Sequence, residues 1–323
     1  MNFSYQEYCT GIFTIRNRND FCDAARQAYS YQCENNAHFA EMKRHLAKIP
    51  DGQFHFLPLE FFKHHSILST AQLPEMVFRS SGTGGLRSQH WLTDVSLYRK
   101  SSLAGFEYFY GDVSKFALLA LLPDYIERGD ASLVFMMEHL IKTGGNPLSG
   151  FYLRNYQQLT EVILQLEKSG QKYLLLGISS ALIEFSHFLN TPLKNAIVME
   201  TGGAKGMQRE WIRAELHDYL KFHLGLSEVH SEYGMTELLS QAYSSGNGIF
   251  RCPPWMKVLV RDTNDPLDIA TEGTGALNII DLANINSCCF IETSDLGRVY
   301  PDGSFEVFGR FDHGDVRGCN QMM

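Results

Sequence analysis

Hydrophobic and polar residues change their spacing twice along the chain. Over residues 1–75, apolar positions recur at helical intervals, at 21–28 and again at 38–46. From residue 76 to residue 247, short apolar runs alternate with amphipathic stretches of helical length. The runs lie at 76–78, 116–122, 173–177, 196–199 and 228–230, and the helical stretches at 92–108, 131–142, 156–168, 180–189 and 207–223. This alternation predicts an α/β fold with a mostly parallel sheet and covering helices, the last of them ending at Gly225.

From residue 248 onward, the pattern predicts short strands and tight turns instead. Five candidate strands follow one another without a helix of any length, at 249–251, 256–261, 276–280, 288–291 and 304–308. We therefore expect a β-rich subdomain over 248–312, packed on an α/β body over 76–247. A helical segment over 1–75 precedes this body, and residues 313–323 form a tail too short for a further domain.

Composition and charge narrow the class of protein. The 323-residue chain is 44% hydrophobic and 20% charged, which is ordinary globular usage and argues against disordered and fibrous classes. Its longest apolar run, 116–122, is far shorter than the roughly 20 residues of a membrane-spanning helix. A net charge of −8 disfavours nucleic acid as a partner. Seven cysteines, an odd number without a Cys-x-x-Cys pair, predict reduced thiols and a cytoplasmic location.

The segment from Phe78 to Arg87 carries the first candidate for binding chemistry. Between a short apolar run and a helical pattern it gathers glycines and hydroxyls: Ser80, Ser81, Gly82, Thr83, Gly84 and Gly85. Backbone N–H groups at glycines, together with hydroxyl donors, form a nest for phosphate oxygens, and Arg87 supplies positive charge. The segment lacks the Gly-Lys-Ser/Thr ending of a Walker loop. Taken alone, an ordinary Gly/Ser turn explains it equally well.

A second candidate lies at the end of the apolar run near residue 230. Here Gly234 permits a sharp turn after the strand, and Thr236 and Glu237 fall in the next turn. Such a turn can place the Tyr233 ring, a hydroxyl and a carboxylate on one side of a cleft. An aromatic face suits a purine, and a carboxylate near phosphates suits Mg²⁺. Taken alone, Glu237 is more often a solvated charge or a residue at a helix start.

The third candidate combines residues 292–298 with residues 309–312. An Asp that follows a strand, as expected for Asp295, can accept hydrogen bonds from two sugar hydroxyls, and Arg310 can add a charged donor. The alternative is that Asp295 and Asp312 only form turns, which is the commonest role of aspartate in such segments.

The order and spacing of these motifs resemble the acyl-adenylate-forming superfamily of acyl-CoA synthetases, firefly-type luciferases and peptide-synthetase adenylation domains. The resemblance runs from Phe78 to Asp312. Within the superfamily, the chain is most similar to the acyl-protein synthetases of bacterial bioluminescence. Three features carry this narrower resemblance: the Ser/Gly loop with Arg87 and His90, the run Glu200-Thr201-Gly202-Gly203-Ala204-Lys205, and the ending Gly309-Arg310-x-Asp312-x-x-Asp315-Val316-Arg317-Gly318-Cys319.

The resemblance implies a role for each matching residue. Residues 80–85 would cradle the phosphates of ATP, with Gly202 and Gly203 also in the nucleotide site. Tyr233 would stack on adenine beside Gly234, Thr236 would touch phosphate, and Glu237 would hold Mg²⁺. The ribose would be held by Asp295 and Arg310, and Cys319 would accept the acyl group as a thioester.

Two departures from the superfamily pattern stand out. Position 84 is Gly where the superfamily usually has Thr, which removes one hydroxyl from the phosphate loop. We also expect this chain to lack the small C-terminal domain of the larger relatives and its catalytic lysine. Either Lys205 or Arg87 could replace that charge, and the sequence leaves this choice open.

These implications combine into an expected activity. It is the ATP-dependent activation of a carboxylic acid, in this family a fatty acid, as its acyl-adenylate, followed by transfer to Cys319. Delivery to an acyl-CoA-reductase-like partner would follow. Two alternatives stay open. One is a phenylacetate-type acyl-CoA ligase, and the other is a relative that binds nucleotide or acyl ligands without turnover. For Cys319 itself, the alternative is a bystander thiol in the C-terminal tail.

Overall fold

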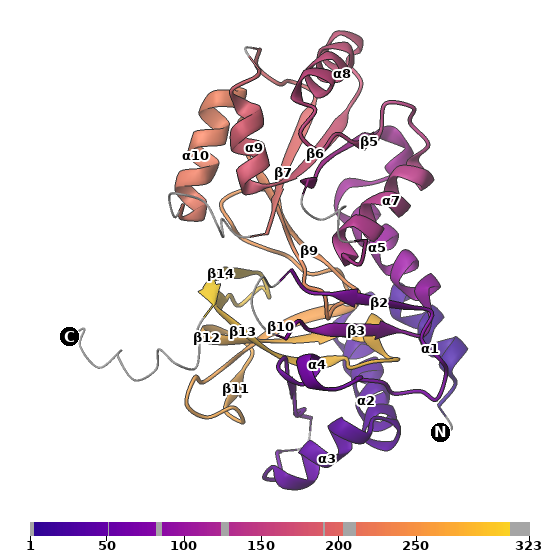
Figure 1. Ribbon diagram of the computed structural model, residues 1–323. Helices are drawn as coiled ribbons and strands as arrows, with labels where there is room; N and C mark the ends of the chain where they lie inside the picture. Colours follow the sequence, from indigo (N-terminus) through magenta and orange to yellow (C-terminus); the bar gives the residue numbers. More distant parts are fainter. Residues whose placement is uncertain are drawn as a thin grey trace, which may run out of the picture. The chain divides into compact units, whose positions relative to one another are not determined.

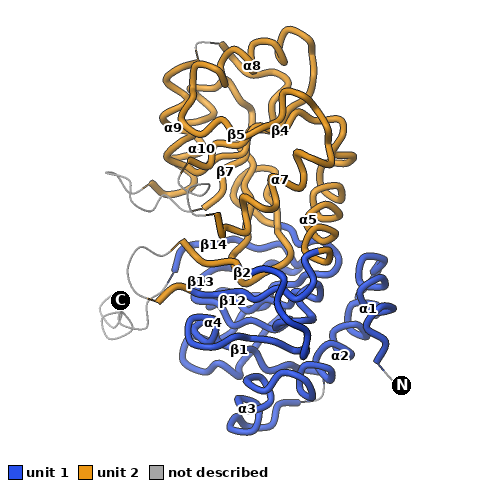
Figure 2. The backbone as a smooth tube through the Cα atoms, turned by 45° about the vertical axis from the view of Figure 1, so that its right-hand side comes forward, with its two compact units in different colours: residues 1–77, 88–95, 251–323 blue, residues 78–87, 96–250 orange. Residues whose placement is uncertain are grey.

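The chain divides into two compact units, coloured separately in Figure 2. Unit 1 combines 1–77, 88–95 and 251–323, and unit 2 combines 78–87 and 96–250. The computed structural model describes residues 3–50, 52–81, 86–123, 129–189, 191–202 and 211–310. Each unit is built around its own sheet, and the two are described separately.

Unit 2 is an α/β layer structure around a mostly parallel sheet with the strand order β5-β4-β6-β7-β8-β9 (Figure 1). Neighbouring strands from β5 to β8 pair in parallel, and β9 is antiparallel to β8. The strands are β4 (Ala117–Leu121), β5 (Gly150–Phe151), β6 (Tyr173–Ile178), β7 (Ala196–Thr201), β8 (His230–Tyr233) and β9 (Ala242–Ser244). The predicted mostly parallel sheet is therefore confirmed.

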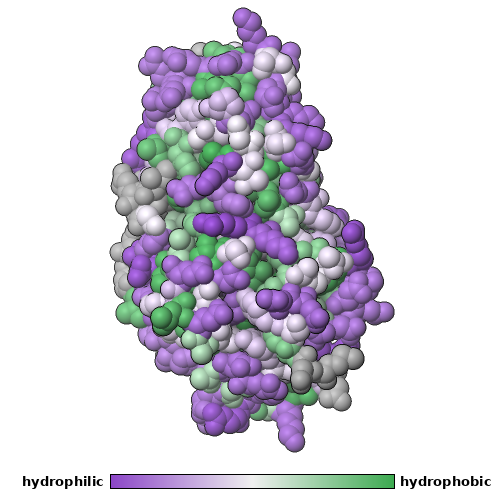
Figure 3. All heavy atoms as spheres, turned by 90° about the vertical axis from the view of Figure 1, so that its right-hand side faces the viewer, coloured by the Kyte–Doolittle hydropathy of each residue, from purple (hydrophilic) through white to green (hydrophobic). Residues whose placement is uncertain are grey.

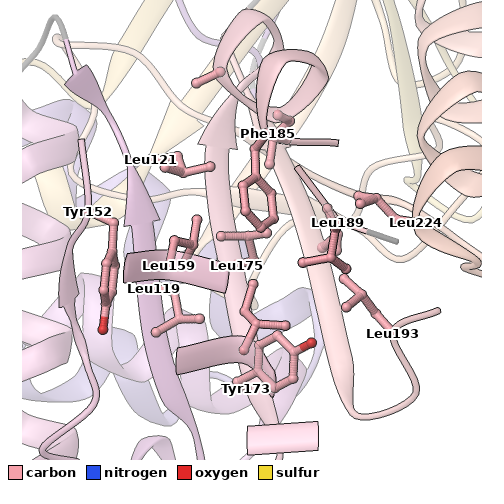
Figure 4. Close-up of a cluster of buried hydrophobic side chains, with 14 of the residues drawn as sticks. Leu119, Leu121, Tyr152, Leu159, Tyr173, Leu175, Phe185, Leu189, Leu193 and Leu224 are labelled. Atoms are coloured by element: carbon pink, nitrogen blue, oxygen red, sulfur yellow. The ribbon is translucent and has the colours of Figure 1, made fainter. Parts of the chain in front are cut away.

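Helices cover both faces of this sheet. They are α5 (Val95–Tyr110), η2 (Val113–Lys115), α7 (Ser132–Gly144), α8 (Tyr156–Ser169), α9 (Ser179–Ser186) and α10 (Arg213–Leu224). On one face, side chains of α8, α9 and α10 close over Leu119 and Leu175 in a continuous hydrophobic cluster (Figure 4). Leu118 and Leu174, whose side chains point to the opposite face of the sheet, are equally buried. A strand with both faces covered reads as an unbroken apolar run, which is why the sequence pattern locates these strands.

The end of α10 follows from local chemistry. Gly225 adopts the left-handed conformation with φ of 66° and its N–H donates to the carbonyl of Lys221. Only glycine takes up this conformation without steric cost, so the helix ends where the sequence predicts.

Unit 1 contains a sheet with the order β1-β13-β12-β10-β11, and β14 pairs with β13. Its strands are β1 (Leu57–Pro58), β10 (Met256–Arg261), β11 (Ile269–Ala270), β12 (Gly273–Asp281), β13 (Phe290–Val299) and β14 (Phe305–Arg310). Its helices are α1 (Tyr5–Gly11), η1 (Ile12–Thr14), α2 (Arg18–Asn35), α3 (Ala37–His45), α4 (Phe61–His64) and η3 (Leu282–Asn284). Strands β2 (Met76–Arg79) and β3 (Gln89–Leu92) form a separate two-stranded sheet.

Hydrogen bonds explain why the N-terminal helices belong to unit 1 with the late strands. The amide of Gln32, buried on α2, donates to the carbonyl oxygens of Asn284 and Ile285 at 3.3 and 3.1 Å. The side-chain carbonyl oxygen of Gln32 accepts a hydrogen bond from the backbone N–H of Cys289 at 3.0 Å. Strand β1, which the sequence pattern did not predict, pairs in parallel with β13. The first 75 residues are thus joined to the β-rich part by contacts that local periodicity does not reveal.

No helix in the described part of the chain is long and apolar enough to cross a membrane. Figure 3 shows a face on which hydrophilic side chains predominate and hydrophobic ones gather only in small patches.

The close pairing of β13 with β14 makes one glycine indispensable. A Cβ atom on Gly297 would overlap the carbonyl oxygen of Glu306 and lie 2.9 Å from a Leu277 methyl group. We expect Gly297→Ala to lower the free energy of unfolding by about 2–3 kcal/mol, because the clash involves backbone that cannot rotate away. Urea titrations measure this loss. Gly11→Ala, at a glycine with open space around it, is the matched control and is expected to be neutral or slightly stabilising.

Candidate functional site

The carboxyl ends of β7 and β8 lie side by side and carry two of the predicted motifs. In the register of the two strands Thr201 is opposite Glu232, so Gly202 and Tyr233 come next at the same edge of the sheet. Gly202 adopts a positive φ of 72° and its carbonyl accepts a hydrogen bond from the Ser179 hydroxyl at 3.2 Å. Open α/β sheets bind their ligands at this edge, beyond the carboxyl ends of the strands.

Tyr233 ends β8, and residues 234–237 lead from it into a turn, as predicted. The Tyr233 ring is only 8% exposed and packs against Phe250, with ring centroids 5.8 Å apart and planes at 60°. Thr236 and Glu237 form the turn, and Glu237 is 3% exposed. The carboxylate is therefore not a solvated charge. Stacking of Tyr233 on adenine and metal binding by Glu237 stay predictions.

The reason for glycine at position 234 differs from the predicted one. Its backbone is not left-handed, so conformational freedom does not require glycine. Instead, a Cβ atom there would lie 2.5 Å from a carboxylate oxygen of Glu232. Since Glu232 is buried and accepts a hydrogen bond of 2.5 Å from the Thr201 hydroxyl, it has little room to move. Gly234 is needed to accommodate this neighbouring acid.

Glu232 is an unusual acid that the sequence motifs did not single out. The pKa of its carboxyl is raised to about 7, chiefly by burial and also by the negative charge of Glu200, while the hydrogen bond from Thr201 acts to lower it. Strongly shifted pKa values are enriched at functional sites, so Glu232, directly before Tyr233, is a candidate site residue. No sequence signal identifies it, because the predicted apolar run ends at residue 230 and only the structure extends β8 through Glu232.

Glu200 lies on the opposite face of β7 from Thr201 and anchors a second polar cluster. Its Oε1 is 3.1 Å from Nε of Arg213 and 3.6 Å from Nε2 of His217, and that His217 nitrogen is 3.3 Å from the Ser231 hydroxyl. Burial raises the pKa of Glu200, but the bonds to His217, Arg213 and Ser231 outweigh burial and leave the pKa below its usual value. A charged Glu200 thus holds α10 against the strand that leads into Gly202.

Two arginines stand at either end of the predicted phosphate loop and meet the same carboxylate. Oδ2 of Asp130 is 3.4 Å from Nη1 of Arg79 and 3.6 Å from Nη2 of Arg87. The carbonyl of Asp130 also accepts the backbone N–H of Arg79 at 2.9 Å. Its Oδ1 is buried and has no hydrogen-bond partner within the described residues. Both guanidinium groups are about one-third exposed, which leaves them positioned to bind an anion.

In unit 1, the predicted pair of Asp295 and Arg310 is brought together by strand pairing. The two residues are opposite each other in β13 and β14, and Nε of Arg310 is 3.2 Å from Oδ1 of Asp295. Asp295 is 5% exposed, whereas half of the Arg310 side chain is accessible.

The expectation that Asp295 follows a strand is wrong, because β13 continues to Val299. The register shifts between Leu296 and Gly297, so a bulge sits next to Asp295. Such irregularities redirect side chains and commonly accompany functional sites. Asp295 lies within β13 and its carboxylate pairs with Arg310, so it does not serve as a turn former, and Asp312 lies outside the described residues.

Several predicted residues lie outside the described part of the chain: Gly82, Thr83, Gly84, Gly85, Gly203, Lys205 and Cys319. In the predicted phosphate loop, the two described residues are Ser80, which is half-buried, and Ser81, which is exposed. The described residues thus form two groups, one in unit 2 around Gly202, Tyr233 and Glu237 and one in unit 1 around Asp295. No cluster of three or more acidic, histidine or cysteine residues suited to a metal occurs among the described residues.

Comparisons with known proteins place the fold. No protein-family model matches the sequence, and the comparison with curated proteins gives no significant match. Among solved structures, ATP-bound MatB from Rhodopseudomonas palustris is 15% identical with a TM-score of 0.54, over 72% of this chain and 47% of that one. A long-chain-fatty-acid-CoA ligase, FadD1 from Archaeoglobus fulgidus, is 16% identical with a TM-score of 0.54, over 73% and 51%.

A third similar structure is the luciferase-like enzyme of the nonluminescent mealworm Zophobas morio. It is 16% identical with a TM-score of 0.52, over 76% of this chain and 59% of that one. The chain thus spans about half the length of the solved structures it matches. These proteins belong to the adenylate-forming superfamily, and its fold is the one adopted here.

Proposed function

We propose that this protein activates a carboxylic acid with ATP to form an acyl-adenylate. The observation that carries the proposal is the edge of the unit 2 sheet, where Gly202 follows β7 and Tyr233 and buried Glu237 lie at and just beyond the end of the adjacent parallel strand β8. The fold shared with ATP-bound MatB supports ATP as the nucleotide.

The reaction joins two negatively charged reactants. An oxygen of the substrate carboxylate attacks the α-phosphorus, the bond to the β-phosphate oxygen breaks, and pyrophosphate leaves. The attack becomes feasible only when positively charged groups at the site neutralise the negative charges of the carboxylate and the phosphates. Arg79 and Arg87, gathered by Asp130, supply positive charge at the two ends of the Ser/Gly loop.

Magnesium fits the donor set at Glu237. Mg²⁺ usually takes one or two protein carboxylates and completes its shell with water and phosphate oxygens, so a single buried carboxylate suffices. Glu237 would hold the ion on the phosphates, which supplies charge neutralisation there. In unit 1, the paired Asp295 and Arg310 offer an acceptor and a donor for the ribose hydroxyls.

Acid-dependent exchange of labelled pyrophosphate into ATP tests the proposal. With Mg²⁺ and a panel of acids from acetate to palmitate, we expect exchange with at least one acid and none without acid. If ATP binds and no acid supports exchange, the chain is a nucleotide-binding relative without turnover.

The finer proposal concerns the acid and its acceptor. The resemblance to acyl-protein synthetases and the fold shared with a fatty-acid ligase support a fatty acid as substrate and Cys319 as the acceptor. A reductase resembling acyl-CoA reductases would take the acyl group onward. A thiol acceptor must stay reduced, which suits the cytoplasm. The competing candidate, an acyl-CoA ligase, uses the thiol of CoA instead.

The variant Cys319→Ser separates the two half-reactions. We expect acid-dependent exchange to persist and the hydroxylamine-sensitive acyl adduct to disappear, because a serine hydroxyl without an adjacent base is a poor nucleophile. Intact mass after incubation with ATP, Mg²⁺ and acid measures the adduct. Cys33→Ser, at another thiol that is not fully buried, is the matched control and should keep it. A wild-type protein that never carries the adduct but produces acyl-CoA would favour the CoA ligase.

A further inference from the structure

A cavity of about 190 Å³ opens in unit 1, outside the residues assigned to acid activation. Helix α2, the segment before β1, and strands β10, β11 and β12 enclose it (these elements are labelled in Figure 1). Its wall is largely apolar, with side chains of Phe21, Ala25, Phe54, Phe56, Leu259 and Ile280. An engineered apolar cavity of roughly 150 Å³ accommodates benzene, so this one has room for a ligand of that size.

Two positive charges line the same cavity. Arg18, at the first turn of α2, and Lys257, on β10, both contribute to the wall, and neither forms an ion pair within the described residues. Lys257 is half-buried. Burial lowers the pKa of its ammonium group, and the charge of Arg18 lowers it further, against a smaller opposite effect of Cys22. The two cations therefore repel each other beside an apolar surface.

The beginning of α2 carries charges of both signs, with Arg18 and Asp20 in its first turn. Asn17 caps the helix by accepting the backbone N–H groups of Asn19 and Asp20. A cation in the first turn of a helix is opposed by the helix dipole, whose positive end lies there. An anion between Arg18 and Lys257 would relieve the mutual repulsion of these two cations.

We propose that this cavity binds a small carboxylate with a compact apolar group, its carboxylate between Arg18 and Lys257. A guanidinium group matches a carboxylate in two parallel hydrogen bonds, and the ammonium group can bind the remaining lone pairs. An aromatic or short branched acid would fill the apolar part. The proposal does not depend on acid activation, since every residue it uses lies in unit 1 and binding requires no nucleotide.

Titration of the full chain with benzoate, in the absence of nucleotide, tests the proposal. Calorimetry or ligand-observed NMR should show saturable binding at one site, and benzamide, of similar shape without the charge, should bind at least about tenfold more weakly. Lys257→Met and Arg18→Gln should each weaken benzoate binding by about tenfold. Lys48→Met, at an exposed lysine of unit 1 outside the cavity, is the matched control and should leave the affinity unchanged.

Thermal melts show whether Lys257→Met and Arg18→Gln fold. If one of them does not fold, the benzoate affinity of the other still tests the proposal. Benzoate binding that neither substitution changes would overturn the assignment, as would benzamide binding with equal affinity. Inorganic phosphate that displaces benzoate at equal concentration would also overturn it, because the site would then select charge without an apolar group.

Discussion

Replacing Glu237 with glutamine should reduce acid-dependent pyrophosphate exchange by about 100-fold or more. Glutamine keeps the size of the buried side chain but removes the negative charge that would hold Mg²⁺ on the phosphates of ATP. The magnesium concentration needed for half-maximal exchange should rise at the same time. Exchange at saturating acid, measured over a range of Mg²⁺ concentrations, reports both effects.

The control for this variant is Glu138→Gln, which makes the same chemical change on the exposed surface of α7 in the same unit. It should leave exchange and its metal dependence unchanged. Thermal melts of both variants separate a lost site from a lost fold. Near-normal exchange with normal metal dependence in a folded Glu237→Gln protein would show that Glu237 does not hold Mg²⁺ in the site.

Glu232→Gln should change how stability depends on pH. The folded-state pKa of Glu232 is raised from 4.5 to about 7, so the folded protein retains a proton that the unfolded chain has lost. The stability of the wild type therefore falls as pH rises from about 4.5 through about 7. A shift of this size corresponds to roughly 3 kcal/mol, since one pKa unit is worth about 1.4 kcal/mol. Glutamine is always neutral and can still accept the hydrogen bond from Thr201.

Urea titrations at pH 5, 6, 7 and 8 measure the effect. The difference in unfolding free energy between Glu232→Gln and wild type should move in favour of the variant across this range and level off above pH 8. Glu107→Gln, at an exposed position on α5, should follow the wild-type curve. A constant difference between Glu232→Gln and wild type at all four pH values would mean that Glu232 titrates at an ordinary pKa.

The positions of the elements in unit 2 were largely determined by the sequence. Apolar runs such as 116–122 lack polar alternation because helices cover both faces of a parallel sheet, and β4 and β6 appear where these runs predict them. Gly225 ends α10 for a local reason, the left-handed backbone. The turn with Thr236 and Glu237 after β8 also follows from neighbouring residues.

The contacts between distant residues were decided only by the tertiary structure. Asp130 meets Arg79 from 51 positions away, and no periodicity connects the two. The predicted strand near residue 288 extends to Val299 because β12 and β14 pair along it, which places Asp295 inside a strand rather than after one.

The same distinction explains the buried acids. Nothing in the spacing of residues 228–237 indicates that Glu232 is enclosed, because its burial depends on Thr201 of the neighbouring strand and on the close approach of Gly234. Local periodicity determines which segments become helices and strands. Pairing and packing between segments far apart in the chain determine which side chains are desolvated and which partners they meet, and these two effects together set the charge that each acid carries, as Glu232 and Glu200 show.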